Sequence, residues 1–359
     1  MTSLIAGTAR RPLRSIAQMV TQPLAPRDFI DLIDPLGSSR DLRGRIDAVT
    51  AETADAATIR IRVGRGWRGH QAGQYVRIGV DVAGVRQWRT YSITSRANAK
   101  AGRFITITVK TVPDGVVSNY LVRRAKAGTL VHLDQACGDF TLPATRPAKV
   151  LFLTAGSGIT PVMGMLRSHA DELADVVVVH SAPTADDMVF GTELRALADT
   201  GSVRLVEHHT AKSPRIAAAD LDVLVPDWAD RQTWACGPAA LLDDVEAHWA
   251  RHDLADRLHT ERFTAPAVGG GDGGPISFTR TGSTIETEPG ATLLEAGENA
   301  GVLMPSGCRM GVCFGCVIPL RNGAVRDVRN GDVTIGAPDA GVLVQTCIST
   351  VAGSCEIDI

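Results

Sequence analysis

The sequence predicts a multidomain protein in which an antiparallel β-barrel is followed by an α/β domain with a parallel sheet and then by a small β-rich domain. Three observations lead to this fold class. The chain has 359 residues, more than one hydrophobic core usually supports. Short β-like runs separated by glycine-containing turns give way after Pro147 to apolar runs that alternate with helix-like stretches. A glycine-rich stretch then separates the last part of the chain from the rest.

The barrel is predicted at residues 43–146, where short β-like runs alternate with glycine-containing turns. These runs lie at 58–63, 74–80 and 104–110. Residues 1–42 precede the barrel and carry four arginines before their first acidic residue, Asp28. The four are Arg10, Arg11, Arg14 and Arg27. We expect a basic helical arm that packs on the following domains or frays, with peripheral membrane contact as the alternative.

The α/β domain is predicted at residues 147–263, because apolar runs alternate there with helix-like stretches, as in parallel β/α units. These runs lie at 150–153, 176–179 and 233–236. Residues 264–275, T-A-P-A-V-G-G-G-D-G-G-P, have few side chains to pack and are predicted to be a flexible linker. The last domain, residues 276–359, is expected to contain two hairpins, a helix and a final strand. Their predicted positions are 276–287, 317–325, 292–300 and 355–359.

The composition is that of a soluble globular protein, with 44% hydrophobic residues, 21% charged residues and a net charge of −2. This balance argues against a nucleic-acid partner. No apolar run approaches the roughly 18 residues of a membrane-spanning helix, and no signal peptide is evident. We therefore expect a cytoplasmic protein, with contact at the inner face of the plasma membrane if the arm binds lipid.

Four cysteines carry the strongest signal. Cys308, Cys313 and Cys316 have the C-x4-C-x2-C spacing of plant-type 2Fe-2S proteins, and Cys347 follows as the fourth ligand. Three thiolates from one tight loop can converge on a small cluster because glycines allow the loop to curl. Zinc is the alternative metal, but this spacing fits it poorly. Cys355 is the rival fourth ligand, although it lies inside a predicted strand.

Two motifs in the barrel indicate a flavin site. Arg89-Thr90-Tyr91-Ser92 resembles the R-x-Y-S signature of the ferredoxin reductase superfamily. That resemblance implies that Arg89 and Thr90 bind the cofactor, that Tyr91 covers the flavin ring, and that Ser92 lies near N5, where hydride arrives. A second element, with Gly115, Val117 and Ser118, resembles the family's helix that opens toward the flavin diphosphate.

Three further motifs indicate a nicotinamide nucleotide site. A buried strand runs into a turn and helix whose cofactor-binding residues are predicted to be Gly156, Gly158, Thr160 and Pro161. Cys236-Gly237-Pro238 resembles the family's C-G-P element, in which Cys236 would help to orient the hydride donor against the flavin. Glu261-Arg262-Phe263 resembles the tail of related domains near the flavin, and Phe263 is the predicted contact.

Taken together, residues 43–359 resemble a flavin reductase fused to a C-terminal plant-type ferredoxin domain. Reductase components of 3-ketosteroid hydroxylases and of phenylacetyl-CoA epoxidase have this organisation. Residues 23–32 and the segment R-T-Y-S-I-T-S at 89–95 resemble the corresponding sequences of reductases of mycobacterial membrane stearoyl-CoA desaturases. The resemblance implies a β-grasp fold for the last domain, FAD in preference to FMN, a 2Fe-2S cluster, and NADPH or NADH as the donor.

The implied activity is electron transfer from NAD(P)H, through a flavin that accepts hydride and releases single electrons, to the 2Fe-2S cluster. The acceptor implied is a membrane fatty acyl desaturase or hydroxylase, or alternatively a soluble steroid or aromatic oxygenase. A redox-sensing module is a third interpretation. Residues 181–187 contain no lysine or arginine and favour NADH, whereas the desaturase resemblance favours NADPH.

Overall fold

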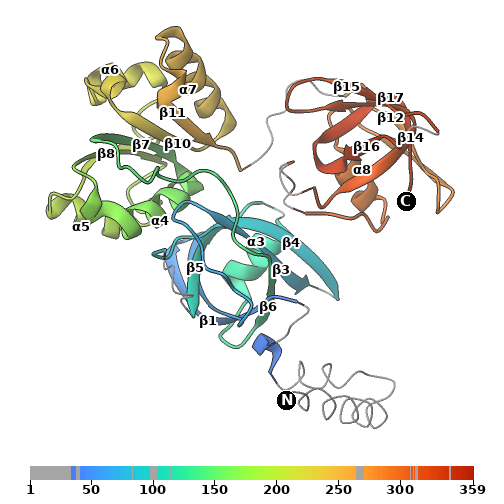
Figure 1. Ribbon diagram of the computed structural model, residues 1–359, viewed down its shortest axis with the longest axis horizontal. Helices are drawn as coiled ribbons and strands as arrows, with labels where there is room; N and C mark the ends of the chain where they lie inside the picture. The colour runs from blue at the N-terminus through green and yellow to red at the C-terminus, as the bar shows by residue number, and fades with distance from the viewer. Residues whose placement is uncertain are drawn as a thin grey trace, which may run out of the picture.

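The computed structural model describes residues 34–37, 41–82, 84–97, 103–113, 115–263, 271–307, 309, 311, 314–338 and 341–359. These residues form an antiparallel sheet, a parallel sheet and a mixed sheet, each in its own part of the molecule (Figure 1). Most of the predicted arm, residues 264–270 of the predicted linker, and the predicted ligands Cys308 and Cys313 lie outside the described residues.

The first sheet is an antiparallel barrel with the strand order β4-β3-β6-β1-β2-β5. Its strands are β1 (Arg43–Thr53), β2 (Ala56–Val63), β3 (Tyr75–Val82), β4 (Val85–Ser92), β5 (Phe104–Lys110) and β6 (Leu130–Leu133). A bridge between Ile93 and Ile107 joins the two ends of the sheet. Helix α3 (Val116–Arg123) buries Val117 and Leu121 in the barrel core.

The second sheet is parallel throughout, in the order β11-β10-β7-β8-β9. Its strands are β7 (Lys149–Ala155), β8 (Asp175–Ala182), β9 (Arg204–His209), β10 (Gln232–Cys236) and β11 (Leu258–Glu261). Its helices are α4 (Ile159–His169), α5 (Gly191–Asp199), α6 (Leu221–Leu224) and α7 (Ala239–Arg251). Phe152 packs in one core cluster with α4, and the next residue, Leu153, packs in another with α7. Both faces of the sheet are therefore buried, which explains its continuous apolar runs.

The third sheet is mixed, with the order β13-β12-β17-β14-β15 and with β16 also paired to β14. Its strands are β12 (Gly274–Phe278), β13 (Ser283–Thr287), β14 (Val317–Asp327), β15 (Val333–Ile335), β16 (Leu343–Gln345) and β17 (Ser349–Ile357). Helix α8 (Leu293–Asn299) packs on this sheet and starts with a capping box between Thr292 and Glu295. A mixed sheet that holds one helix is the predicted β-grasp arrangement.

Two predicted elements of this domain are wrong in detail. The hairpin predicted at 317–325 is one continuous strand, β14. Asn322-Gly323 does not turn the chain, because the strand register shifts there as in a β-bulge, and Gly323 adopts a φ of 80°. A Cβ at Gly323 would lie 2.0 Å from the carbonyl oxygen of Ser354, so only glycine fits. The final strand, β17, begins at Ser349 rather than at Cys355.

The helices in the described part of the chain include none that is long and apolar enough to cross a membrane.

Candidate functional site

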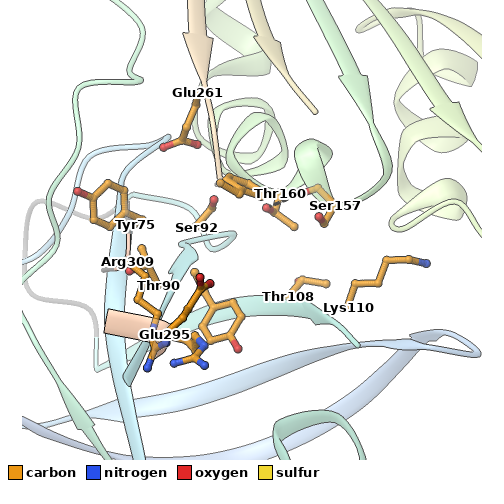
Figure 2. A pocket seen from close by; sticks show the side chains of 13 residues that line it. Tyr75, Thr90, Ser92, Thr108, Lys110, Ser157, Thr160, Glu261, Glu295 and Arg309 are labelled. Carbon is orange, nitrogen blue, oxygen red and sulfur yellow. Dashed lines mark hydrogen bonds between the residues drawn. The ribbon is translucent and has the colours of Figure 1, made fainter. Parts of the chain in front are cut away.

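A pocket of about 390 Å³ is lined by residues from all three sheet-containing regions. Its lining residues are Tyr75, Arg89, Thr90, Tyr91, Ser92, Thr108, Lys110, Ser157, Thr160, Glu261, Phe263, Glu295 and Arg309. Figure 2 shows Thr90 and Ser92 on the barrel side, Glu261 above them, and Ser157 and Thr160 at the turn of the parallel-sheet domain. Six of the predicted cofactor-binding residues therefore lie in one pocket: Arg89, Thr90, Tyr91, Ser92, Thr160 and Phe263.

The end of strand β4 presents polar atoms that have no partner within the described structure. The hydroxyl oxygens of Thr90 and Ser92 are buried and make no hydrogen bond there. A buried hydroxyl without a partner is costly, so these groups fit a ligand that brings its own polar atoms. Tyr91 lies between them, and burial raises the pKa of its phenol, which therefore stays protonated. This arrangement fits the flavin ring that the motif predicts.

The barrel contributes two cationic groups to the pocket, Arg89 and Lys110, and Lys110 is paired with Asp55. The Nη1 atom of Arg89 donates to the carbonyl oxygen of Trp88 at 2.7 Å, and no carboxylate of a described residue pairs with it. Burial lowers the pKa of Arg89, and the positive charge of Arg309 lowers it further. The negative charge of Glu298 opposes this lowering, but no described carboxylate forms an ion pair with Arg89. A partly buried guanidinium with donors to spare fits an anionic ligand such as a phosphate.

The two glycines of the turn after strand β7 have different roles, one toward a ligand and one in packing. Gly156 has a φ of 55°, and a Cβ built on it would meet no atom within 4 Å, so its surface is open to a ligand. A Cβ on Gly158 would lie 2.0 Å from the carbonyl oxygen of Cys236, so Gly158 is required for close packing against strand β10. Pro161 is buried in the first turn of α4, where proline is well tolerated.

Other predicted contacts lie outside this pocket. The Val117 side chain is buried in the barrel core, and the Ser118 hydroxyl binds within its own turn, accepting from Val112 N and donating to Gly115 O. The start of α3 at Gly115 therefore offers backbone groups rather than these side chains. Cys236 is completely buried, and burial raises the pKa of its thiol, so the group is neutral.

Glu261 is a pocket residue that the sequence motif did not single out. It ends strand β11, next to Cys236 on strand β10, and points into the pocket in Figure 2. Its Oε2 is buried without a partner among the described residues. Burial raises the pKa of Glu261 to about 8, so a protonated carboxylic acid is the main form at neutral pH. Only the E-R-F tail resemblance could have indicated it.

Glu261 should make stability fall as pH rises. Its folded pKa of about 8 exceeds the ordinary value of 4.5, so the folded state binds more protons between these pH values and loses stability across this window. The side-chain amide of the E261Q variant does not titrate, so the melting temperature of this variant relative to wild type should increase from pH 5 to pH 9. We expect a gain of about 8–15 °C. The raised pKa removes about 4 kcal/mol of stability between pH 5 and pH 9, and 1 kcal/mol moves Tm by about 2–4 °C in domains of 150–250 residues.

Differential scanning calorimetry of the two proteins at pH 5, 7 and 9 measures this effect. Asp227→Asn is the matched control, because hydrogen bonds from Arg231 and Lys149 lower the pKa of this carboxylate to about 2. Its contribution changes only at acidic pH, so the D227N difference should stay flat from pH 5 to pH 9. A flat E261Q difference would show that Glu261 is ionised throughout.

The C-terminal domain brings two predicted metal ligands together. The Sγ atoms of Cys316 and Cys347 lie 3.2 Å apart, and both side chains are buried. Cys355 lies on strand β17, paired with Ile276 and Gly323, where burial raises the pKa of its thiol to about 12. Among the residues that the structure describes, no three His, Cys, Asp or Glu side chains converge. The geometry of the described pair fits two thiolates on one iron and favours Cys347 over Cys355.

A second hollow lies at the carboxyl ends of the parallel strands. Its lining includes Ala155, Ser181, Pro183, Thr210, Arg215 and Pro238, so it adjoins the predicted nucleotide turn. In open parallel sheets this edge is where dinucleotides bind. Arg215 was not predicted, because it lies more than thirty residues after the end of strand β8, where a residue that contacts the 2′-phosphate is expected.

Three family models match the chain. The oxidoreductase FAD-binding domain matches residues 44–142, the oxidoreductase NAD-binding domain matches 152–247, and the 2Fe-2S iron-sulfur cluster binding domain matches 278–352. The fold and the pocket therefore define an oxidoreductase that carries FAD-binding, NAD-binding and 2Fe-2S domains on one chain.

Individual relatives agree with this class. The chain is 46% identical to the NADPH oxidoreductase of Mycobacterium tuberculosis, over 99% of this chain and 95% of that protein. It is 29% identical to the ferredoxin reductase component of the 3-ketosteroid-9-alpha-monooxygenase of Mycolicibacterium smegmatis, over 90% and 98%. Phthalate dioxygenase reductase shares the fold, with a TM-score of 0.63 at 22% identity and coverage of 89% and 98%. The chain belongs to the family of ferredoxin-reductase-type flavin oxidoreductases with a C-terminal 2Fe-2S domain, which confirms the resemblance.

Proposed function

We propose that this protein oxidises NADPH and delivers single electrons, through FAD and a 2Fe-2S cluster, to a separate oxygenase. The observation that carries the proposal is the pocket shared by the three domains, in which Ser92, Thr160 and Arg309 line one space. Bound FAD would supply the conversion of a two-electron hydride into single electrons. The chain's residues would hold the nicotinamide, the flavin and the cluster loop close together.

Each predicted residue has a proposed role in binding a cofactor. Arg89 and the backbone at Gly115 would bind the flavin phosphates, Tyr91 would cover the ring, and Ser92 would donate a hydrogen bond near N5. Gly156 and Gly237 would allow the dinucleotide to approach the backbone. We propose that Cys308, Cys313, Cys316 and Cys347 bind the cluster, and that the domains extend over 43–146, 147–263 and 276–359.

An oxygenase is the proposed acceptor because relatives named for oxygenase systems share this domain order. The M. smegmatis relative is a component of a 3-ketosteroid monooxygenase, and the phthalate dioxygenase reductase fold matches nearly full length. The sequences of residues 23–32 and of the R-T-Y-S-I-T-S segment resemble those of desaturase reductases. This resemblance supports a membrane fatty acyl desaturase or hydroxylase as the particular acceptor.

Purified holoprotein tests the central proposal. Mixed with ferricytochrome c as a one-electron acceptor, it should reduce two cytochromes for each NADPH oxidised, because a hydride carries two electrons. Flavin and cluster absorbance should bleach when NADPH is added without oxygen. A protein that contains both cofactors but leaves cytochrome c oxidised would contradict the proposed function.

Arg215 should select NADPH over NADH. It lines the second hollow and forms no ion pair with another described residue, whereas Asp244 there accepts a hydrogen bond from Ala218 N at 2.6 Å. A charge-assisted contact to the 2′-phosphate is worth about 1.5–3 kcal/mol, so R215Q should raise KM for NADPH by about 10–100-fold. NADH has no 2′-phosphate, and its KM should change less than about twofold.

Steady-state kinetics with both nucleotides measure this selectivity. Arg251→Gln on α7 is the control, because it removes an arginine of the same domain outside the hollow. Equal changes in KM for NADPH and NADH in R215Q would show that Arg215 does not contact the 2′-phosphate.

We also propose that the N-terminal end of the barrel binds the inner face of the plasma membrane together with residues 1–42. Arg45 and Arg62 face each other in the β1–β2 register, and Arg103 lies at the adjoining end of β5. None of the three pairs with an acid in the described structure, and they line a hollow beside Asp34, next to the arm. Like charges in register are destabilising unless an anion binds.

Sedimentation with vesicles that contain phosphatidylglycerol tests this proposal. The wild type should sediment together with the vesicles, and the variant in which Arg45, Arg62 and Arg103 are replaced by glutamine should stay in solution.

A further inference from the structure

The ferredoxin domain carries a partly exposed apolar strip that is adjacent in sequence to two of the proposed cluster ligands. Strands β14 and β16 pair so that Val317 faces Gln345 and Pro319 faces Leu343. Ile318 and Val344, the residues between them, are buried in the core, so the other members of these pairs point outward. Val317 follows Cys316, and Gln345 lies two residues before Cys347. The outward strip therefore adjoins both of these cysteines along the chain.

Phe314 extends this strip into the cluster loop. Val317 N donates to Phe314 O at 3.3 Å, so Phe314 adjoins the start of β14. Its side chain is 68% exposed and that of Leu343 is 62% exposed. Phe314 also has a φ of 55°, a conformation that is uncommon and unfavourable for a bulky residue. An aromatic side chain held in solvent by an unfavourable backbone conformation points to a contact that is made with another molecule.

The other side of the same loop faces the flavin pocket. Arg309, the residue after Cys308, lines that pocket and forms an ion pair with Glu298 of α8 at 2.5 Å. In Figure 2, Arg309 lies beside Thr90 of strand β4. Phe314 and Leu343 do not line this pocket. The cluster loop therefore has one side turned to the flavin domain and one side open to solvent.

The charge of the domain indicates the kind of partner. Residues 276–359 contain nine carboxylates, five arginines and no lysine, a balance of −4. Four of the arginines are already held in ion pairs: Arg280, Arg309, Arg321 and Arg329. Bound thiolates would add further negative charge. A partner with an apolar patch surrounded by lysine or arginine residues is complementary to this surface.

We infer that the strip of Phe314, Val317, Pro319 and Leu343 is the docking surface for the electron-accepting protein, whose contact face is apolar and ringed by cationic side chains. This inference rests on the proposed function. In the transfer step one electron leaves the reduced cluster and reduces one acceptor molecule, and no bond forms or breaks. None of these four residues lines the flavin pocket, so acceptor binding on the strip leaves the pocket residue Arg309 in place.

The test uses the full-length holoprotein, reduced with stoichiometric dithionite, and ferricytochrome c as a cationic haem-protein probe. Stopped-flow mixing gives the second-order rate constant of electron transfer without NADPH, so a failure of the NADPH reaction does not affect this measurement. F314A should lower the rate constant about tenfold at low ionic strength, as expected for a central aromatic contact. Added salt should slow the wild type, because opposite charges steer the encounter.

Leu343→Ser is the second variant, because Leu343 lies outside the ligand loop and its replacement leaves the cysteine spacing intact. It should slow the reaction in the same direction, with unchanged cluster absorbance. Val223→Ala is the control, since Val223 is 82% exposed on α6 of the nucleotide domain. Rate constants of L343S and of cluster-containing F314A within twofold of wild type would overturn the docking surface. If F314A loses the cluster, the rate constant of L343S alone decides whether the strip is the docking surface.

Discussion

Replacing Cys347 by alanine is expected to remove the 2Fe-2S cluster and to abolish NADPH-dependent reduction of cytochrome c. Cys347 and Cys316 are buried with their sulfur atoms 3.2 Å apart, so each is placed to bind the same iron. A cluster with three protein thiolates lacks one of its four ligands. Ferricyanide, a small acceptor that can take electrons from the flavin, should still be reduced by NADPH, because no barrel residue changes. Iron analysis and the electron paramagnetic resonance spectrum of the reduced protein measure the cluster.

Cys355→Ala is the matched control for this experiment. Cys355 is as buried as the proposed ligands Cys316 and Cys347, but it lies within strand β17 and packs in the core of the sheet. Alanine there removes a single sulfur atom from the core, so the domain should fold and keep its iron. The opposite result, with iron retained in C347A and lost in C355A, would assign the fourth ligand to Cys355.

The sequence predicts the order and type of the three domains because each has its own hydrophobic period. Buried parallel strands such as β7 appear as continuous apolar runs, whereas barrel strands such as β2 alternate. The C-x4-C-x2-C spacing and the R-x-Y-S motif are local, so they too can be recognised in the sequence. The predicted hairpin at 317–325 was wrong because Asn-Gly occurs both in hairpin turns and in β-bulges. Only the pairing of β14 with β17 shows that Gly323 lies in a bulge.

The residues that sequence reasoning missed lie far along the chain from the motifs they join. Arg215 enters the nucleotide hollow from a loop after β9, and Glu295 and Arg309 enter the flavin pocket from another domain. Local pattern cannot show such contacts, because they depend on how separate elements pack. Val117 is the reverse case: it belongs to a flavin motif, yet its side chain supports the barrel core. A motif therefore locates a site better than it assigns a role to each residue.

Replacing Arg89 by alanine is expected to weaken FAD binding by about 10–100-fold, the effect of losing a charge-assisted contact worth about 1.5–3 kcal/mol. The guanidinium is partly buried and has no carboxylate partner among the described residues, so its remaining donors are available to a phosphate. Arg309 lies close enough to lower the pKa of Arg89, but its own charge is paired with Glu298, so Arg89 is the group expected to contact the phosphate. R89K should be intermediate, because an ammonium keeps the charge but loses the planar fork.

Fluorescence titration of the flavin-depleted protein with FAD measures the affinity of each Arg89 variant. Arg86→Ala is the control, because Arg86 lies on the same strand but forms an exposed ion pair with Asp81 at 2.9 Å. Wild-type affinity in R89A would mean that the diphosphate is held by backbone groups at the start of α3 alone. That outcome would separate the two anion-binding elements of the barrel, since the helix start would then account for the whole of the phosphate binding.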